Sequence, residues 1–188
     1  MCRFSCGQSA PVYDLNNNNI QRTIVPLQEI SPNIQDATLA IEDPGFYQHH
    51  GVEFTAILRA IYVDITRGGL AQGGSTITQQ VIKNSVLTND KTFARKLKEW
   101  VLALKIERVL TKQQILELYL NQVPYGGTMY GVEEASQNFF GKHASDVSLP
   151  EAAYLAAVLS ATTYYSPYGN HKDALSAAIA SLERAKIA

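Results

Sequence analysis

The chain has 188 residues, of which 46% are hydrophobic and 18% are charged, and its formal net charge is −1. A chain of this length can bury most of its apolar surface in one domain, and this composition is too apolar for a disordered protein. The near-zero net charge provides no basic field for nucleic acid, so any recognition of phosphate must come from locally placed cations.

The first 35 residues predict irregular structure, because prolines such as Pro32 interrupt any helix. Cys2 and Cys6 are the only cysteines, and no C-x-x-C pair or histidine cluster accompanies them. They favour a local disulfide or two free thiols over a metal site. No apolar run approaches the roughly 18 residues of a spanning helix, and the N-terminus lacks the apolar centre of a signal peptide. We therefore expect neither an anchor nor an export signal in the chain as given.

The stretch AIEDPGFYQHHGVE, residues 40–53, contains the first candidate for acid–base chemistry. Glu42 and Asp43 are adjacent, follow an apolar segment and precede a Pro-Gly turn. A carboxyl group in this position is a candidate for a raised pKa, and hence for general acid or base catalysis. The alternative is a helix C-terminus with solvent-exposed acids. We interpret His49 and His50 as structural or hydrogen-bonding groups, since their spacing does not match a metal site.

Residues 54–69 predict a helix whose apolar stripe consists of Phe54, Ile57, Leu58, Ile61 and Ile65. Gly68 and Gly69 end this helix. Tyr62 and Val63 extend the apolar surface further around the helix than one buried face needs. We therefore expect this segment to touch a membrane surface, with one flank in lipid.

The stretch GGSTITQQVIKN, residues 73–84, combines hydroxyl and amide side chains with one cation and no carboxylate. A helix with Ser75 as its N-cap directs Ile77, Val81 and Val86 to the core. The same helix exposes one face formed by Thr76, Gln79, Gln80 and Lys83. Sugar hydroxyls and amides suit the neutral groups, and a phosphate suits Lys83. The alternative is an ordinary solvated face, although such faces usually carry more Glu and Lys.

The stretch ARKLKEWVLALKIER, residues 94–108, predicts a helix with an inward apolar stripe of Leu97, Val101 and Leu104. One turn of this helix is crowded with the charged residues Arg95, Lys96, Lys98 and Glu99. Two interpretations remain open. Either Arg95 and Glu99 form a surface ion pair, or the three cations hold a pyrophosphate.

The rest of the chain also has helical patterns, and strand-like alternation is nearly absent. Capping boxes are formed by Thr111 with Gln114 and by Ser148 with Glu151. One further helix face is formed by Val132, Ala135 and Phe139, and that helix stops at Gly141. These patterns together predict a mainly α fold.

The stretches EDPGFYQHHG, GGSTITQQVIKN, RKLKE and ILELYLNQVPYG occur in this order. They resemble the motifs of the peptidoglycan glycosyltransferases, which include monofunctional transglycosylases and the N-terminal domains of class A penicillin-binding proteins. The resemblance covers about residues 24–170. The pattern G-x-S-T-I-T-Q-Q is met without a gap by residues 73–80. The pattern E-D-x-x-F-x-x-H-x-G is met by Glu42, Asp43, Phe46, His49 and Gly51.

The resemblance implies a mainly α, partly lysozyme-like domain over residues 24–188, preceded by an irregular tail of residues 1–23. It implies an enzyme that polymerises lipid II, a lipid-linked disaccharide-pentapeptide, into peptidoglycan glycan strands. Glu42 is implied as the base that deprotonates the acceptor's 4-hydroxyl. That oxygen attacks the donor's anomeric carbon with inversion, and lipid pyrophosphate leaves. Glu99 is implied as a second catalytic glutamate near the leaving group, and help from Mg²⁺ or Mn²⁺ stays open.

The resemblance also assigns substrate-binding residues. The basic residues around the pyrophosphate are Lys83, Lys91, Arg95, Lys96 and Lys98. The sugar-contacting residues are Ser75, Thr76, Gln79 and Gln80, and the set is completed by Asp43 and Phe46. The leaving group is already activated, so a strong acid is less needed than in a glycosidase, and cations stabilise the departing charge.

The chain departs from the family pattern at a few positions. Lys91 stands where many relatives have an arginine. A lysine cannot make the planar, bidentate contact that an arginine makes with a phosphate. In the stretch VLSAT, Leu159 and Thr162 stand in place of prolines, and an arginine expected near Ala178 is missing. No S-x-x-K transpeptidase module follows, so this chain is not expected to cross-link.

The implied partners are lipid II, the growing glycan strand, the membrane surface, and transpeptidases and other wall-synthesis proteins, with no nucleic acid. The implied location is the outer face of the bacterial cytoplasmic membrane. Two alternative functions remain open. A lysozyme-like hydrolase would cut glycan instead of extending it, and the cationic clusters speak against it. A non-catalytic module that binds the lipid precursor is compatible with the departures near the C-terminus.

Overall fold

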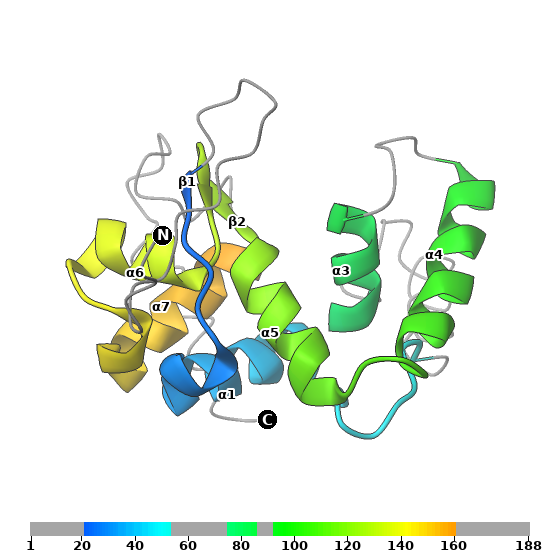
Figure 1. Cartoon of the computed structure of the whole chain (residues 1–188), viewed down its shortest axis with the longest axis horizontal. Coiled ribbons are helices and arrows are strands. Elements are labelled where there is room, and N and C mark those ends of the chain that lie inside the picture. The colour runs from blue at the N-terminus through cyan, green and yellow to red at the C-terminus, as the bar shows by residue number, and fades with distance from the viewer. Residues whose placement is uncertain (1–20, 54–74, 86–91, 161–188) are drawn as a thin grey trace, which may run out of the picture.

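The computed structural model describes residues 21–53, 75–85 and 92–160, and this part of the chain is mainly helical (Figure 1). The prediction of a mainly α fold is confirmed. The helices are α1 (Pro32–Glu42), α3 (Ile77–Ser85), α4 (Phe93–Ile106), α5 (Lys112–Gln122), α6 (Val132–Phe140) and α7 (Leu149–Ser160). Two short 3₁₀ helices are η1 (Leu27–Glu29) and η2 (Ala144–Asp146). The helix expected over residues 54–69 lies outside the described residues.

Three short strands form a small sheet with the order β1-β3-β2. The parallel partner of β3 (Met129–Tyr130) is β1 (Gln21–Arg22), and its antiparallel partner is β2 (Pro124–Gly126). Residues 21–23, which were expected in the irregular tail, therefore already pair with the domain. The division into residues 1–23 and 24–188 stays a prediction.

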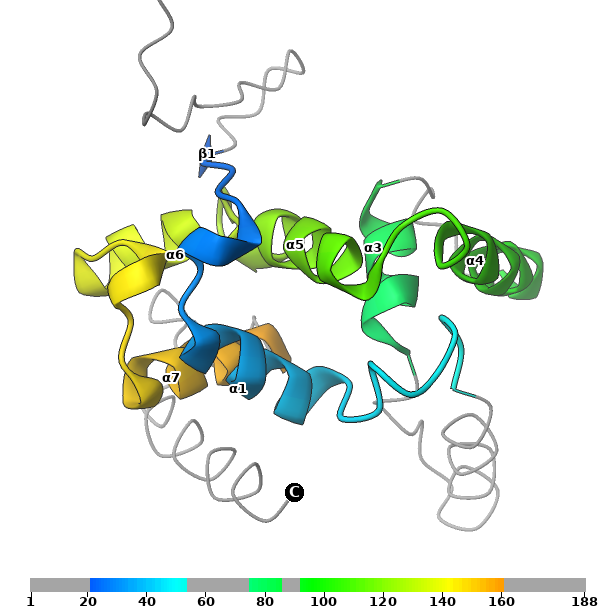
Figure 2. The same cartoon turned by 60° about the horizontal axis from the view of Figure 1, so that its bottom comes forward.

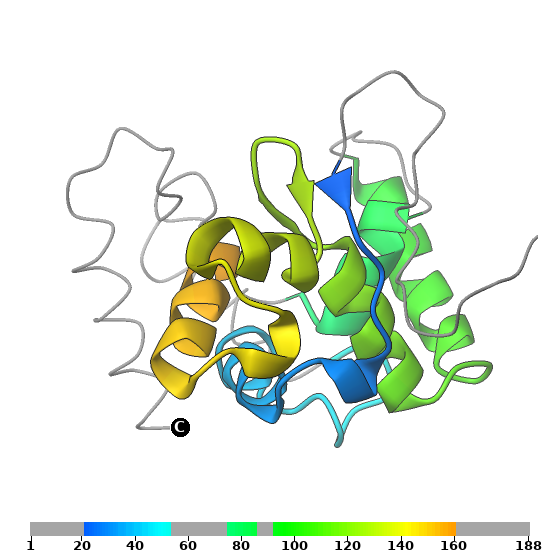
Figure 3. The same cartoon turned by 60° about the vertical axis from the view of Figure 1, so that its left-hand side comes forward.

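The helix α5 lies in the middle of the described part, between α3 on one side and the pair α6 and α7 on the other (Figures 1 and 3). The segment after β1 runs along α5 and is held there by Asn121, whose side chain exchanges hydrogen bonds with the backbone of Val25 at 2.9 and 3.0 Å. The largest buried apolar side chains include Phe46, Ile77, Ile115, Tyr119 and Tyr125. Together with Ile34 of α1 and Leu155 of α7, these side chains form one core that joins α1, α3, α5, α7 and the sheet.

The helix ends follow local sequence signals, with one correction. The Thr111–Gln114 capping box is confirmed, and so is the end of α6 at Gly141, whose φ of 65° suits glycine. The Glu151 carboxylate accepts hydrogen bonds from the Ser148 backbone N–H and hydroxyl. The prediction that Pro32 interrupts a helix is wrong. Pro32 begins α1, because the first helical turn does not need its missing N–H.

The apolar stripe of α4 points outward, so the prediction of an inward stripe is wrong. Leu97, Val101 and Leu104 are 50%, 45% and 37% exposed, whereas Glu99 and Ala103 are buried. Periodicity identifies residues that share a helix face, but it does not say which face meets the core. In Figures 1 and 2, α4 lies at one end of the described part, and α3 separates it from α5.

Among the described helices, none combines the length and the apolar character needed to cross a membrane.

Candidate active site

Glu42 is the last residue of α1, and it meets the polar stripe of α3. The Gln80 amide donates a hydrogen bond from Nε2 to Glu42 Oε2 at 2.7 Å. Burial raises the pKa of the Glu42 carboxyl above its ordinary value, the Gln80 hydrogen bond lowers it, and the charge of Asp43 raises it. Although Glu42 ends α1, its carboxyl is partly buried and accepts a hydrogen bond from the Gln80 amide. The alternative of a solvent-exposed acid is therefore wrong.

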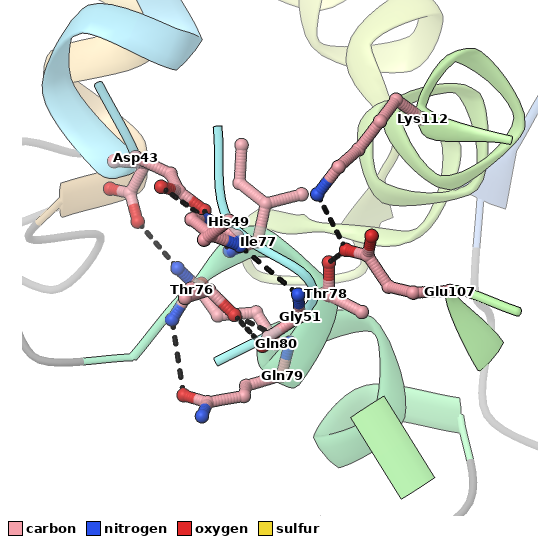
Figure 4. Close-up of polar contacts among 11 residues, drawn as sticks. Asp43, His49, Gly51, Thr76, Ile77, Thr78, Gln79, Gln80, Glu107 and Lys112 are labelled. Atoms are coloured by element: carbon pink, nitrogen blue, oxygen red, sulfur yellow. Dashed lines mark hydrogen bonds and ion pairs between the residues drawn. The ribbon is translucent and has the colours of Figure 1, made fainter. Parts of the chain in front are cut away.

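Asp43 joins the loop after α1 to the beginning of α3 (Figure 4). Its Oδ2 accepts from the Ile77 backbone N–H at 3.0 Å, and both carboxylate oxygens lie 2.9 Å from His49 Nε2. The Gly51 N–H donates to His49 Nδ1 at 3.1 Å, so Nε2 carries the proton that is donated to Asp43. The interpretation of His49 as a hydrogen-bonding residue is confirmed. An anion beside the helix N-terminus also stabilises α3.

Asp43 and Phe46 were both expected to bind substrate, but they are 3% and 1% exposed. The Asp43 carboxylate accepts from His49 and from the Ile77 backbone N–H, and Phe46 packs beneath Lys112, whose Nζ lies 4.4 Å from the ring centroid. In this structure both residues hold the loop that follows Glu42. A role for either residue in binding substrate stays a prediction.

The helix α3 begins one residue later than expected, and Thr76 caps it instead of Ser75. Thr76 Oγ1 accepts from the Gln79 N–H at 3.2 Å, and Gln79 Oε1 accepts from the Thr76 N–H at 3.1 Å. The Thr76 hydroxyl also donates to the Gly51 carbonyl at 2.7 Å. Gly51 has a φ of 89°, and a Cβ there would lie 2.8 Å from the Ala103 carbonyl, so only glycine fits.

This capping box buries half of the polar stripe. Thr76 and Gln79 are 3% and 0% exposed, so the prediction that both lie on an exposed face is wrong. The physical reason is the T-x-x-Q spacing within STITQQ, which satisfies two backbone N–H groups at the helix start. Gln80 remains partly exposed and Lys83 is exposed, while Ile77 and Val81 are buried as predicted. Val86 lies outside the described residues.

Glu99 is the centre of a second charged cluster, on the side of α4 that faces α3. Its side chain is 2% exposed and contacts Arg95 Nη1 at 3.3 Å and Lys96 Nζ. Lys96 Nζ also donates to Ser75 Oγ at 2.9 Å, just before α3. The pair of Arg95 and Glu99 is therefore partly buried, and the interpretation as a surface pair is wrong. Lys98 is exposed, and Lys91 lies outside the described residues.

A metal ion bound by the protein does not fit the contacts of Glu99. Two cations already occupy the carboxylate. Within the described ranges, no group of three or more His, Cys, Asp or Glu side chains is placed to hold a metal ion. These contacts therefore assign no chemical step to Mg²⁺ or Mn²⁺.

Further residues support the site, although no sequence pattern assigned them to it. Glu107 accepts from the Thr78 hydroxyl at 2.6 Å and from Lys112 Nζ at 2.7 Å, which ties α3 to the turn before α5 (Figure 4). Tyr119 of α5 donates to Gln80 Oε1 at 3.4 Å. Tyr119 lies in the motif ILELYLN, but nothing in the pattern of that motif distinguished it as a residue of the site.

The family model described as transglycosylase matches residues 8–186. Penicillin-binding protein 1F of Bacillus subtilis is 42% identical over 165 residues, which are 85% of this chain and 23% of the relative. Penicillin-binding protein 1A of Aquifex aeolicus is 45% identical over 174 residues, covering 89% of this chain and 24% of the relative. The chain thus spans about a quarter of the length of these curated relatives.

Proposed function

Since the chain belongs to the transglycosylase family, we propose that it polymerises lipid II into peptidoglycan glycan strands by inverting glycosyl transfer. The contact between Glu42 and Gln80 is the observation that carries this proposal. It joins two motifs that lie 38 residues apart in the sequence and places a carboxyl beside a helix that carries amide, hydroxyl and cationic groups. The proposed domain comprises residues 24–188.

In the proposed reaction, the Glu42 carboxylate takes the proton of the acceptor's 4-hydroxyl. The acceptor oxygen then forms a bond to the donor's anomeric carbon, while the bond from that carbon to the pyrophosphate oxygen breaks. A raised pKa makes Glu42 a stronger base than an exposed glutamate, which suits proton abstraction near neutral pH. Glu42 ends the step protonated, and lipid pyrophosphate leaves as an anion.

The groups proposed to bind the substrate lie on both sides of the α3 N-terminus. Ser75 and Gln80 are polar groups for sugar contacts, and Gln79 and Thr76 hold the helix start that presents them. The departing charge is stabilised by Lys83, Arg95, Lys96 and Lys98, together with Lys91 from outside the described residues. Glu99 orients Arg95 and Lys96 and keeps their side chains from turning into solvent.

A polymerisation assay tests this function directly. Purified chain is incubated with lipid II in detergent, and the products are separated by size. Polymer formation supports the proposal. Release of fragments from mature glycan without lipid II would instead favour a lysozyme-like hydrolase, and binding of labelled lipid II without polymer would favour a non-catalytic module.

Lys83→Ala is expected to weaken donor use without weakening the fold. Lys83 is exposed and lies three residues after Gln80 on α3, so its loss removes little packing. A charge-assisted hydrogen bond to a phosphate contributes about 1.5–3 kcal/mol, which corresponds to a rise of about 10- to 150-fold in KM for lipid II. Steady-state kinetics and the thermal midpoint measure the two effects. Lys142→Ala, at another exposed lysine, is the control for KM only, because it also removes the ion pair between Lys142 and Glu151. A sharp fall in the midpoint with unchanged KM would make Lys83 structural.

We propose that the protein acts at the outer surface of the cytoplasmic membrane, where it meets the growing glycan strand and other wall-synthesis proteins such as transpeptidases. The exposed face of α4 supports a membrane contact. Its apolar stripe of Leu97, Val101 and Leu104 is flanked by the exposed cations Lys98 and Lys105. An apolar stripe bordered by cations suits the interface of an anionic bilayer. The earlier expectation for residues 54–69 stays a prediction.

Replacing both Leu97 and Val101 with Gln is expected to reduce binding to phosphatidylglycerol vesicles severalfold, because it removes most of the apolar stripe. The thermal midpoint should not fall, since both side chains are about half exposed. Vesicle co-sedimentation measures binding. Ile24→Gln is the control, because Ile24 is 45% exposed but lies between β1 and η1. Equal vesicle binding by the double variant and the unaltered chain would exclude this face.

A further inference from the structure

The Gln80 side chain lies between the Glu42 carboxyl and a buried phenol. Its Nε2 donates to Glu42 Oε2 at 2.7 Å, and its Oε1 accepts from the Tyr119 hydroxyl at 3.4 Å. An amide has donors on one side and an acceptor on the other, and a rotation of about 180° about its terminal bond exchanges them. If the amide N–H faces Glu42, it donates to the ionised carboxylate. If the amide oxygen faces Glu42, it accepts only from the protonated carboxyl.

Tyr119 favours one of the two amide orientations. Its side chain is 1% exposed, and burial together with the charge of Glu42 holds the pKa of its phenol well above the ordinary value. The hydroxyl therefore remains protonated and available as a donor. A phenol oxygen is a better donor than acceptor, because its lone pair is delocalised into the ring. Donation to Oε1 keeps Nε2 directed at Glu42.

We propose that Tyr119 is a positioning residue that favours the ionised, base-competent form of Glu42 by orienting and polarising the Gln80 amide. A hydroxyl that donates to the amide oxygen also strengthens the N–H donors of the same amide, because chains of hydrogen bonds are cooperative. In the opposite orientation Oε1 faces Glu42, and only a protonated carboxyl can donate to it. Tyr119 therefore acts on catalysis without touching substrate. The catalytic part of this inference rests on the proposed function.

Tyr125 of β2 provides a matched control. It is also a fully buried tyrosine, and its pKa is raised first by burial and second by the charge of Glu42. Its hydroxyl, however, has no hydrogen-bond partner in the described part of the chain. The titratable groups around Glu42 are thus Asp43 on its own segment, whose charge raises the pKa of Glu42, and Tyr119 on α5 and Tyr125 on β2, whose own pKa values are raised by the charge of Glu42. Only Tyr119 contacts Gln80 among these.

The test compares Tyr119→Phe with Tyr125→Phe. Phenylalanine keeps the ring and the packing, so both variants are expected to fold, and thermal midpoints check this. The pKa of Glu42 is measured by ¹³C NMR of glutamate-labelled protein, with the resonance assigned by its loss in Glu42→Gln. We expect the pKa to rise in Tyr119→Phe and to stay near that of the unaltered chain in Tyr125→Phe. Equal changes in both variants, or no change in Tyr119→Phe, would overturn the inference.

A double-variant cycle shows whether Gln80 transmits the effect. In a Gln80→Ala background, Tyr119→Phe should cause no further change in the pKa of Glu42, whereas an undiminished change would contradict the inference. In the polymerisation assay, Tyr119→Phe should move the acidic limb of kcat/KM to higher pH and lower the rate about three- to fivefold below that limb. The NMR readout needs no substrate. A chain that shows the expected pKa changes but makes no polymer would refute the proposed function and leave the role of Tyr119 intact.

Discussion

Glu42→Gln is expected to lower the rate of polymerisation by about 10²–10⁴, which is the usual effect of losing a general base. Glutamine has nearly the same shape as glutamate, and its Oε1 can still accept the Gln80 hydrogen bond seen at 2.7 Å. Lipid II binding should therefore be largely kept while proton abstraction is lost. Size separation of the products and a binding assay with labelled lipid II measure the two quantities separately.

The same variant has a distinctive effect on stability, because the pKa of Glu42 is raised in the folded chain, mainly by burial. At a pH below the ordinary glutamate pKa, both folded and unfolded chains are protonated at this position, and no stability is lost. As the pH rises from that value through the raised pKa, the unfolded chain binds fewer protons than the folded chain, so the folded state loses stability. Glu42→Gln removes this loss. Its thermal midpoint should equal that of the unaltered chain in acid and match or exceed it at neutral pH.

Glu29→Gln is the control for both effects, since it makes the same chemical change at an exposed carboxyl. It should leave the rate and the pH dependence of the midpoint unchanged. Polymerisation by Glu42→Gln at the rate of the unaltered chain would refute Glu42 as the base. A midpoint that falls at neutral pH would show that the carboxylate stabilises the fold instead of being kept for catalysis.

Local signals in the sequence were sufficient for several elements. The Thr111–Gln114 capping box begins α5, and Gly141 ends α6, because each depends on residues within one turn. The raised pKa of Glu42 was likewise predictable from a carboxyl at the end of an apolar segment. These features depend little on the rest of the chain.

Other features depend on residues that are far apart in the sequence, and patterns could not reveal them. The apolar stripe of α4 was recognised but was predicted to face the core, whereas it is exposed. Which face of α4 is buried depends on where α3 packs, and the sequence of α4 alone does not contain that information. Asp43 accepts from Ile77, 34 residues away, and this buried link between two segments could not be predicted from the motif that contains Asp43. The T-x-x-Q capping box was present in STITQQ, but it competes with the interpretation of the same residues as an exposed polar face.

Glu99→Gln is expected to lower polymerisation by about 10²-fold and also to destabilise the fold. The Glu99 carboxylate is almost fully buried and contacts both Arg95 and Lys96. A neutral amide cannot balance two cations, and hydrogen bonds to charged groups contribute about 1.5–3 kcal/mol each. Arg95 and Lys96 are partly exposed and are free to turn toward solvent, so the contact of Lys96 with Ser75 would be lost. The cations would then no longer be held for the leaving group.

Glu107→Gln is the control that separates a loss of stability from the loss of correctly positioned Arg95 and Lys96 side chains. The Glu107 side chain is 6% exposed and accepts from Lys112, so the same substitution there also breaks a buried ion pair. Its partners, Thr78 and Lys112, are not assigned to substrate. Both variants should lower the thermal midpoint by several degrees, as expected for a chain of this size. Measured well below both midpoints, kcat should fall strongly only in Glu99→Gln. If the two variants lose activity in proportion to their stability, Glu99 is a structural residue. The charge of the leaving pyrophosphate would then be stabilised by Lys83 and Lys98, with no contribution from Glu99.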